Sequence, residues 1–311
     1  MSFPVDLVVT YVDDRDPVWR QAVSQYKVEL SPQRFRSWDI FKYWFRGVEK
    51  HMPFIRTVHL VVSNIEQVPE WLDQSKVHVV LHKDIIPEDL LPTFNSTTIE
   101  MYLCKIPGLA EHFIYSNDDM MPMNDMITGD FFTEDGLPIY ELVNRSEARR
   151  SFRLQCRNSY RLAARLTGYK DDGVHYFYIK HSMSPMLKSC CEEVHRLAGD
   201  EIHKKCNKFR QPWNFTQYLF PDYAIMTSWA VLGEMDLLYV KINSKNIIHD
   251  MANGKVKIIC INDARISDDD AEEDQNANMK IYKNLHNLLE DKFNDISNFE
   301  IQNPRNEHRA K

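Results

Sequence analysis

Short apolar runs separated by polar turns mark the first part of the chain and predict β-strands. Residues 6–12 (DLVVTYV) are apolar and β-branched, and they lead into an acidic turn at 13–16. Runs of similar composition follow at 57–62, 77–81 and 113–115. Short runs of this kind, bounded by Pro, Asp and Asn, are typical of buried strands.

Segments with helical periodicity lie between these strands. Apolar side chains recur at helical spacing over residues 38–50, and Pro17 suits the first turn of a helix after the acidic turn. The T-x-x-E spacing from Thr97 to Glu100 predicts a capping box that begins a helix reaching about Cys104. Strands that alternate with helices are typical of an α/β fold with a mostly parallel sheet flanked by helices.

The pattern changes at about residue 144. Residues 144–220 are rich in arginine and mainly helical in periodicity, and we expect them to form a helical insertion or lid on the α/β core. Strand-like runs return at 237–242 and 256–261, and a helix is predicted from about 277 to 293. The acidic run at 268–274 is expected to be a solvated loop.

Length and composition fit one catalytic domain, expected to span residues 1–300, followed by a frayed tail at 301–311. The chain has 311 residues, of which 43% are hydrophobic and 27% charged, as in an average soluble globular protein. Its net charge of -7 argues against a general nucleic-acid-binding protein. No apolar stretch is long enough to cross a bilayer, and residues 1–6 lack the pattern of a secretory signal, so we expect a cytoplasmic protein.

Three of the six cysteines lie close in sequence to two histidines. The group comprises Cys190, Cys191, His195, His203 and Cys206. Zinc prefers such ligands, but the segment contains no CxxC pair and its spacing is that of an ordinary helix. Reduced thiols are the default interpretation in a cytoplasmic protein, and a structural zinc site is the alternative.

Acidic and amide side chains follow three of the predicted strands at the point where each strand ends. They are Asp13 and Asp16, then Asn117, Asp118 and Asp119, and then Asn262 and Asp263. Ligands of a parallel sheet bind beyond the carboxyl ends of its strands, so these side chains are expected at one edge. Paired carboxylates there could hold a divalent cation against a diphosphate, although Asn and Asp also occur in ordinary turns.

Three further polar residues are candidates for chemistry. Asn95 lies in the loop at 91–96, which either only caps the following helix or places Asn95 and the helix N-terminus near a phosphate. His181 lies in an irregular segment and is either a surface or core residue or a general base. Arg210 lies among aromatic residues and either solvates the surface or pairs with a phosphate.

These segments together resemble the four blocks of the Stealth family, which comprises bacterial capsular and exopolysaccharide phosphotransferases related to the catalytic core of the eukaryotic lysosomal-enzyme N-acetylglucosamine-1-phosphotransferase. The blocks are 6–13 with 16–19, about 34–121, 181–185 with Phe209, Arg210 and Tyr218, and 260–263 with Phe293 and 297–300. Two blocks depart from the usual pattern. Tyr11, Asp14 and Arg15 replace Trp, Gly and Ser, and residues 39–43 (DIFKY) stand where Glu-Leu-Arg-Tyr is usual.

The resemblance implies a Rossmann-type core like that of nucleotide-sugar transferases, and a specific reaction. A sugar hydroxyl would attack the β-phosphorus of a UDP-hexose or UDP-N-acetylhexosamine, forming a phosphodiester in a capsular or cell-surface polysaccharide and releasing UMP. His181 would take the hydroxyl proton, Arg210 would stabilise the phosphate oxygens, and Glu100 would orient a base or bind the metal. Mg²⁺ or Mn²⁺ would bind Asp118, Asp119 or Asp263, and the donor would bind Asp13, Asp16, Asn95, Asn117 and Asn262.

The implied acceptor is a saccharide or a lipid-linked saccharide, so any membrane contact would be peripheral. The nearest alternative is a glycosyltransferase that releases UDP. A second alternative is a non-catalytic module of polysaccharide assembly. A metal-dependent phosphoesterase is disfavoured because no two-metal His/Asp motif is visible.

Overall fold

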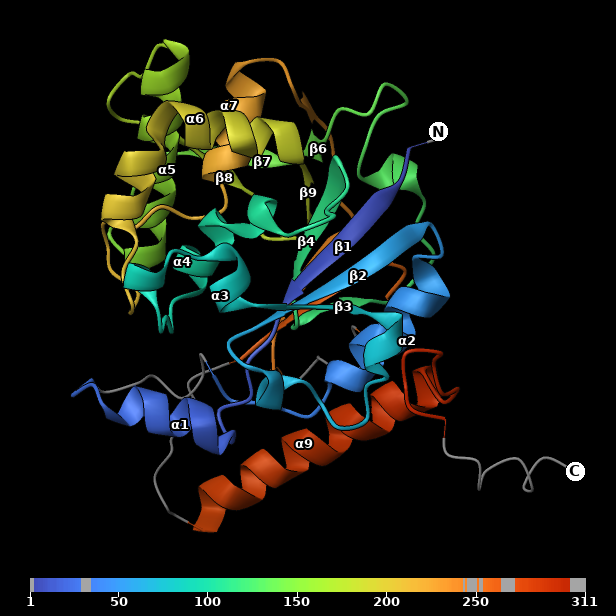
Figure 1. The fold of residues 1–311 in the computed structure, drawn as a ribbon. Coiled ribbons are helices and arrows are strands. Elements are labelled where there is room, and N and C mark those ends of the chain that lie inside the picture. The colour runs from blue at the N-terminus through green and yellow to red at the C-terminus, as the bar shows by residue number, and fades with distance from the viewer. Residues whose placement is uncertain are drawn as a thin grey trace, which may run out of the picture.

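A five-stranded, mostly parallel sheet forms the centre of the fold in this computed structural model (Figure 1). The structure describes residues 3–28, 35–242, 244, 251, 254–263 and 272–302, without the side chains of 272–278. The strand order is β3-β2-β1-β4-β9, and only β9 is antiparallel to its neighbour. The strands are β1 (Val5–Thr10), β2 (Ile55–Val62), β3 (His78–Leu81), β4 (His112–Asn117) and β9 (Ser184–Leu187). The predicted fold class, an α/β fold with helices flanking a mostly parallel sheet, is confirmed.

Helices cover both faces of this sheet (Figure 1). Leu7 and Val9 of β1 pack in a core with α2 and α9, whereas Val8 packs in a second core with α3, α4, α6 and α7. Because successive side chains of a strand point to opposite faces, a strand covered on both faces is apolar at most of its positions. The helices are α2 (Phe41–His51), α3 (His82–Ile85), α4 (Ser96–Met101), α6 (Lys188–Lys205), α7 (Leu219–Met226) and α9 (Glu272–Lys292).

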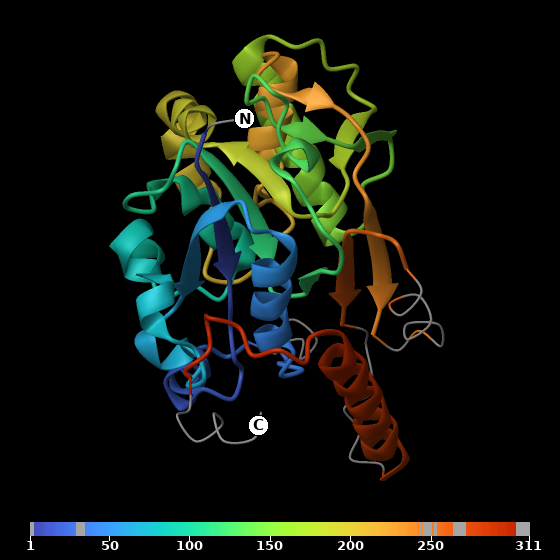
Figure 2. The ribbon, with the colours of Figure 1, turned by 90° about the vertical axis from the view of Figure 1, so that its right-hand side faces the viewer.

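Three small sheets extend the core, and β11 and β12 stand to one side of the central strands (Figure 2). β12 is parallel to β11 and antiparallel to β5, which follows β4 directly in the chain. The small sheets consist of β11 (Leu237–Lys241), β12 (Ile258–Asn262) and β5 (Met120–Pro122), of β7 (Leu142–Arg145) with β8 (Tyr176–Ile179), and of β6 (Ile139–Tyr140) with β10 (Val231–Leu232). Two more helices are α1 (Pro17–Ser24) and α5 (Ser151–Thr167).

The segment 144–220 is more than the expected helical insertion. It contains α5 and α6, but it also contains β8, and its strand β9 completes the edge of the central sheet. β9 is four residues long and contains Pro185, which an edge strand tolerates, so its pattern gave no strand signal. Residues 268–271 of the acidic run and residues 303–311 of the tail lie outside the described residues, and Glu272 already belongs to α9.

No helix within the described ranges is both long and apolar enough to cross a lipid bilayer.

Asp6 is a fully buried charge within β1, and it is satisfied on all sides. Its carboxylate accepts hydrogen bonds from Arg56 at 2.8 and 2.7 Å, from His59 Nε2 at 2.9 Å and from the backbone N–H of Ala110 at 2.8 Å. Burial alone raises the pKa of Asp6, but the hydrogen bonds from His59, Arg56 and Ala110 outweigh burial and lower it to about 2. The ionised carboxylate therefore ties β1 to β2 and to the start of β4.

We expect Asp6→Asn to lower the free energy of unfolding by about 2–3 kcal/mol at neutral pH, as befits a pKa depressed by nearly two units. The folded-state pKa lies below the unfolded value, so the contribution of Asp6 is complete above about pH 4 and is lost as the pH falls toward 2. Urea unfolding at several pH values checks this, because the difference in free energy of unfolding between wild type and variant should become smaller below pH 4. Asp135→Asn, at an exposed position, is the matched control. A difference in free energy of unfolding that stays constant down to pH 2 would contradict the stabilising role of the ionised Asp6 carboxylate.

Candidate active site

A cavity of about 780 Å³ opens at the carboxyl ends of β1 and β4. Thr10 at the end of β1 pairs in register with Asn117 at the end of β4, so the residues that follow the two strands meet at one edge. Both strand ends line the cavity, through residues 10–12 and 117–119. Its volume is within the range of small-molecule sites, about 300–1,000 Å³.

Seven of the predicted site residues line this cavity, although they come from distant parts of the sequence. They are Glu100, Asn117, Asp118, Asp119, His181, Arg210 and Asn262. Four others, Asp13, Asp16, Asn95 and Asp263, are not among its lining residues.

Asp118 and Asp119 form the acidic end of the cavity, in the turn between β4 and β5. Burial, together with the charge of Asp119, raises the pKa of Asp118 to about 7, and burial raises the pKa of Asp119 to about 6. Asp119 Oδ1 is buried without a hydrogen-bond partner, while Oδ2 lies 3.7 Å from the Cys260 thiol of β12. A cation bound here would offset the charge of two neighbouring carboxylates, one of which has a buried oxygen without a hydrogen-bond partner.

These carboxylates fit a divalent cation that is shared with a ligand. Within the described ranges, no three His, Cys, Asp or Glu side chains are grouped closely enough to form a complete protein metal site. Mg²⁺ usually binds one or two carboxylates and fills its shell with water and phosphate oxygens, so Asp118 and Asp119 would suffice. Asp263 is placed differently: its carboxylate lies 3.6 Å from Arg36 Nε, and only its neighbour Asn262 lines the cavity.

Glu100 and Arg210 meet on the side of the cavity formed by α4. Arg210 donates a hydrogen bond to the Ser96 hydroxyl, and the buried Glu100 accepts one from the backbone N–H of Gln217 at 2.9 Å. Burial raises the pKa of Glu100, and the nearby charge of Arg210 and the hydrogen bond from Gln217 oppose this rise.

The predicted capping box at Thr97 and Glu100 is wrong. Asn95 is the N-cap of α4, and its Oδ1 accepts a hydrogen bond from the Thr97 backbone N–H at 3.2 Å. Asn is at least as good an N-cap as Thr, so Asn95 rather than Thr97 caps the helix, which begins at Ser96. Glu100 thereby lies too far along the helix to cap it, and its carboxylate is used by Gln217 instead.

His181 follows β8 and enters the cavity beside Tyr218. Its Nδ1 lies 3.1 Å from the Tyr218 hydroxyl, and the rings of Phe152 and Tyr239 flank it at 6.3 and 6.5 Å between centroids. Burial, reinforced by the charge of Arg210, lowers the pKa of His181 to about 4. The imidazole is therefore neutral near pH 7, as a proton acceptor must be.

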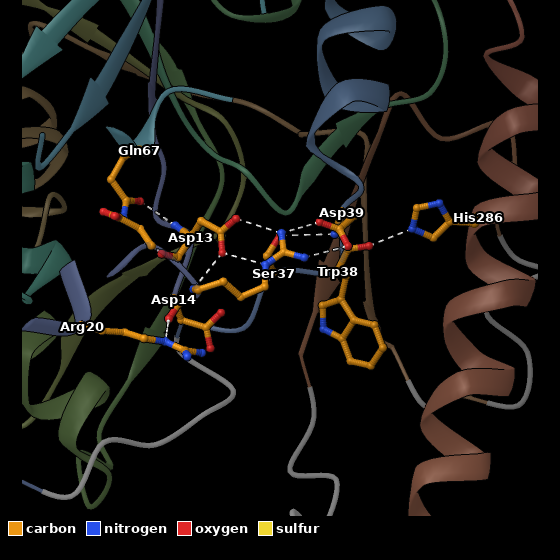
Figure 3. A network of polar contacts seen from close by, with 10 residues as sticks. Asp13, Asp14, Arg20, Ser37, Trp38, Asp39, Gln67 and His286 are labelled. Atoms are coloured by element: carbon orange, nitrogen blue, oxygen red, sulfur yellow. Dashed lines mark hydrogen bonds and ion pairs between the residues drawn. The ribbon is translucent and has the colours of Figure 1, made fainter. Parts of the chain in front are cut away.

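Asp13 takes part in an ionic network beside the cavity rather than in its lining (Figure 3). Arg15 pairs with Asp13 at 2.8 Å and with Asp39 at 2.5 Å, which links the loop after β1 to the residues just before α2. Asp39 has a left-handed backbone with φ of 54°, which Asp adopts more readily than most residues. Burial raises the pKa of Asp13, but the hydrogen bonds from Arg15 outweigh it, and the net shift is downward.

Asp16 and Asn95 have structural partners. Asp16 is the N-cap of α1, where its carboxylate accepts hydrogen bonds from the backbone N–H groups of Val18 and Trp19 and from the Gln67 side chain at 2.7 Å. Asn95 is 1% exposed and, besides capping α4, donates to Asn214 Oδ1 at 3.0 Å. Both side chains hold neighbouring elements in place and neither lines the cavity, and donor contact at these two positions stays a prediction.

The cysteines near α6 are all buried free thiols, and the histidines beside them have other partners. His195 Nε2 lies 2.6 Å from the Met101 carbonyl oxygen, and His203 Nε2 lies 2.8 Å from the Asp89 carboxylate. The zinc alternative finds no support in these contacts.

The far wall of the cavity was not anticipated from the sequence. It includes Glu141 and Arg145 at the two ends of β7, Tyr178 and Lys180 at the end of β8, and Tyr239 on β11. α5 lies between the paired strands β7 and β8 in the chain, so no local hairpin signal was present. The only sequence hint was the position of Lys180, directly before His181.

Comparisons with known proteins identify the family to which this chain belongs. Residues 34–140 match Stealth protein CR2, conserved region 2. The exopolysaccharide phosphotransferase cps2G of Lactiplantibacillus plantarum is 34% identical over 317 residues, covering 85% of this chain and 89% of that protein. The capsular polysaccharide phosphotransferase WcwK of Streptococcus pneumoniae is 30% identical over 339 residues, covering 96% of this chain and 99% of that protein.

A solved structure of the galactosyltransferase LgtC, in complex with donor and acceptor sugar analogues, aligns over 89% of this chain and 95% of that chain, with 10% identity and a TM-score of 0.44. The sequence relationships extend over nearly the whole chain at 30–34% identity, and they confirm the resemblance inferred from the four blocks. This chain therefore belongs to the Stealth family of capsular and exopolysaccharide phosphotransferases, and it is a transferase enzyme.

Proposed function

We propose that this chain transfers sugar-1-phosphate from a UDP-hexose or UDP-N-acetylhexosamine to a hydroxyl of a saccharide or lipid-linked saccharide, forming a phosphodiester in a surface polysaccharide and releasing UMP. The observation that carries the proposal is the convergence, in one cavity, of two carboxylates, an arginine and a neutral histidine. The relatives are named capsular and exopolysaccharide phosphotransferases, which supports the polysaccharide context.

Phosphoryl transfer depends mainly on placing the reactants in line and on stabilising charge on the phosphate oxygens. A divalent cation such as Mg²⁺, bound by Asp118 and Asp119, would supply that stabilisation at the donor diphosphate. Arg210, held by the Ser96 hydroxyl beside Glu100, would bind the oxygens of the transferred phosphate. Asn117 and Asn262, which line the same end, would contact the donor.

His181 would accept the proton of the attacking hydroxyl. In that role its Nδ1–H donates to the Tyr218 oxygen, which leaves the Nε2 lone pair for the substrate. Glu100 acts through this arrangement: it accepts from the Gln217 backbone and so anchors the residue that precedes Tyr218. Glu100 is therefore a positioning residue, and of its two predicted roles the geometry favours orienting the base.

The nucleotide released in the reaction tests the reaction class. Incubation with a panel of UDP-sugars, Mg²⁺ and a saccharide acceptor should release UMP, because attack at the β-phosphorus leaves the nucleoside monophosphate. Release of UDP would instead mean attack at the anomeric carbon, and the chain would be a glycosyltransferase. No nucleotide release with any donor, despite measurable donor binding, would favour a non-catalytic assembly module.

We expect His181→Ala to lower kcat by about 10²- to 10⁴-fold while leaving donor affinity nearly unchanged, since general-base catalysis contributes in that range. In the wild type, the rate should fall as the pH drops toward 4, because the imidazole becomes protonated there. Steady-state kinetics across pH, with calorimetric donor binding, measures both effects. His175→Ala, at a half-exposed position, should be neutral. Wild-type turnover by His181→Ala would remove this residue from the mechanism.

Asp119→Asn should weaken metal-dependent donor binding by about 10-fold or more, because even outer-shell changes at metal sites have effects of that size. Calorimetry with a UDP-sugar, in the presence of Mg²⁺ and then of EDTA, gives the comparison. Asp135→Asn again serves as the exposed control. Equal donor affinity of the wild type with and without EDTA would end the metal assignment.

A further inference from the structure

The basic side chains that line the cavity differ in whether a carboxylate of the protein lies close to them. Lys180 pairs with Glu141 at 2.8 Å and also donates to the Met235 carbonyl oxygen at 2.7 Å. Arg210 lies beside Glu100 and donates to the Ser96 hydroxyl. Both cations are thus balanced by carboxylates on their own side of the cavity.

Arg145 has no such partner in the described part of the chain. Its guanidinium lies over the ring of Tyr178, 4.5 Å from the centroid, and its Nε is buried without a hydrogen-bond partner. Among the residues that the structure describes, no carboxylate lies within ion-pair distance of Arg145. Burial of an N–H donor of a charged group without a partner is costly, so the site is incomplete by itself.

The guanidinium of Arg145, which has no carboxylate partner among the described residues, lies where a substrate would bind. Arg145 ends β7 opposite Tyr176 of β8, and both Arg145 and Tyr178 line the cavity. β8 leads directly to Lys180 and His181, so Arg145 lies on the same side of the cavity as His181. The carboxylates Asp118 and Asp119 lie on other elements, in the turn between β4 and β5.

We propose that Arg145, oriented by the ring of Tyr178, is an anion subsite of the cavity that binds a phosphate oxyanion of a substrate. The guanidinium is planar and presents two parallel N–H donors to an oxyanion, while stacking on an aromatic ring limits its freedom before the ligand arrives. The inference rests on the proposed function in taking the cavity as the substrate site. The oxyanion comes either from the diphosphate of the nucleotide sugar or from the diphosphate of a lipid-linked acceptor.

Direct binding tests this subsite without relying on turnover. Calorimetry would use two probes: UDP-N-acetylglucosamine with Mg²⁺, and geranyl diphosphate as a soluble mimic of a lipid-linked diphosphate. Arg145→Ala should weaken one or both probes by about 10- to 100-fold, the effect expected for a charge-assisted hydrogen bond. Loss for the nucleotide alone assigns the subsite to the donor, loss for geranyl diphosphate alone assigns it to the acceptor, and either result supports the anion subsite.

Matched variants separate a binding role from a structural one. Arg149→Ala, nearby in sequence with a side chain 87% exposed, should bind both probes as the wild type does. Tyr178→Phe keeps the ring and should bind normally, whereas Tyr178→Leu removes the stacking surface and should weaken binding in the same direction as Arg145→Ala. Arg145→Gln provides the same comparison if the alanine variant does not fold.

Unchanged affinity of a folded Arg145→Ala or Arg145→Gln variant for both probes would overturn the subsite. This outcome is distinct from failure of the proposed function, which the identity of the released nucleotide decides. A chain that releases UDP but loses diphosphate affinity on Arg145→Ala would retain the subsite and change only the reaction. A chain that releases UMP with Arg145 replaced and both affinities intact would retain the reaction and lose the subsite.

Discussion

The parallel pairing of β1 with β4 is the constraint on which the site depends. It runs in register from Val5 beside His112 to Thr10 beside Asn117, so the two strands end at the same level. The loop after β1 and the Asp118–Asp119 turn are thereby brought to one edge. Antiparallel pairing of β12 with β5 adds a second constraint, because the backbone N–H of Ile261 donates to the Asp119 carbonyl oxygen at 2.8 Å and places the end of β12 against the same turn.

Two hydrogen-bonding contacts at the start of α7 connect further elements around the cavity. The Gln217 backbone N–H contacts Glu100 of α4, and the adjacent Tyr218 hydroxyl contacts His181 after β8. Two neighbouring residues thus fix an acidic and an imidazole side chain that are far apart in the chain. The Gln217–Glu100 contact is buried and the Tyr218–His181 contact is part-buried, so the position of the imidazole depends on the packing of α7.

The sequence predicted the parts of this structure that depend on local pattern. β1 could be recognised because burial on both faces requires a continuous apolar run, and Pro17 marked the start of α1 correctly. β9 was missed because four residues carry too little periodicity, and its place at the sheet edge depends on pairing with β4, about 70 residues earlier in the chain.

The site residues divide along the same line. Asp16 and Asn95 have the side chains expected of ligand contacts, but N-caps require the same residue types, and only the fold shows which use prevails. Arg145 and Tyr178 escaped notice because their meeting depends on two strands separated by a long helix. By contrast, Asp118, Asp119, His181 and Arg210 were candidates from the chemistry of their local sequence and also belong to the family blocks, and the fold brings all four into one cavity.

The Arg15–Asp39 contact links two departures from the usual family blocks that are far apart in sequence. The usual first block has Ser where Arg15 stands, and the usual second block differs around Asp39. Here the side chains of Arg15 and Asp39 form an ion pair near residues 10–12, which line the cavity. Loss of Arg15 alone would leave Asp13 and Asp39 without the guanidinium that they share. Loss of Asp39 alone would leave Arg15 paired with Asp13 but no longer connected to the residues before α2. Chimeras between relatives should therefore transplant both segments as one unit.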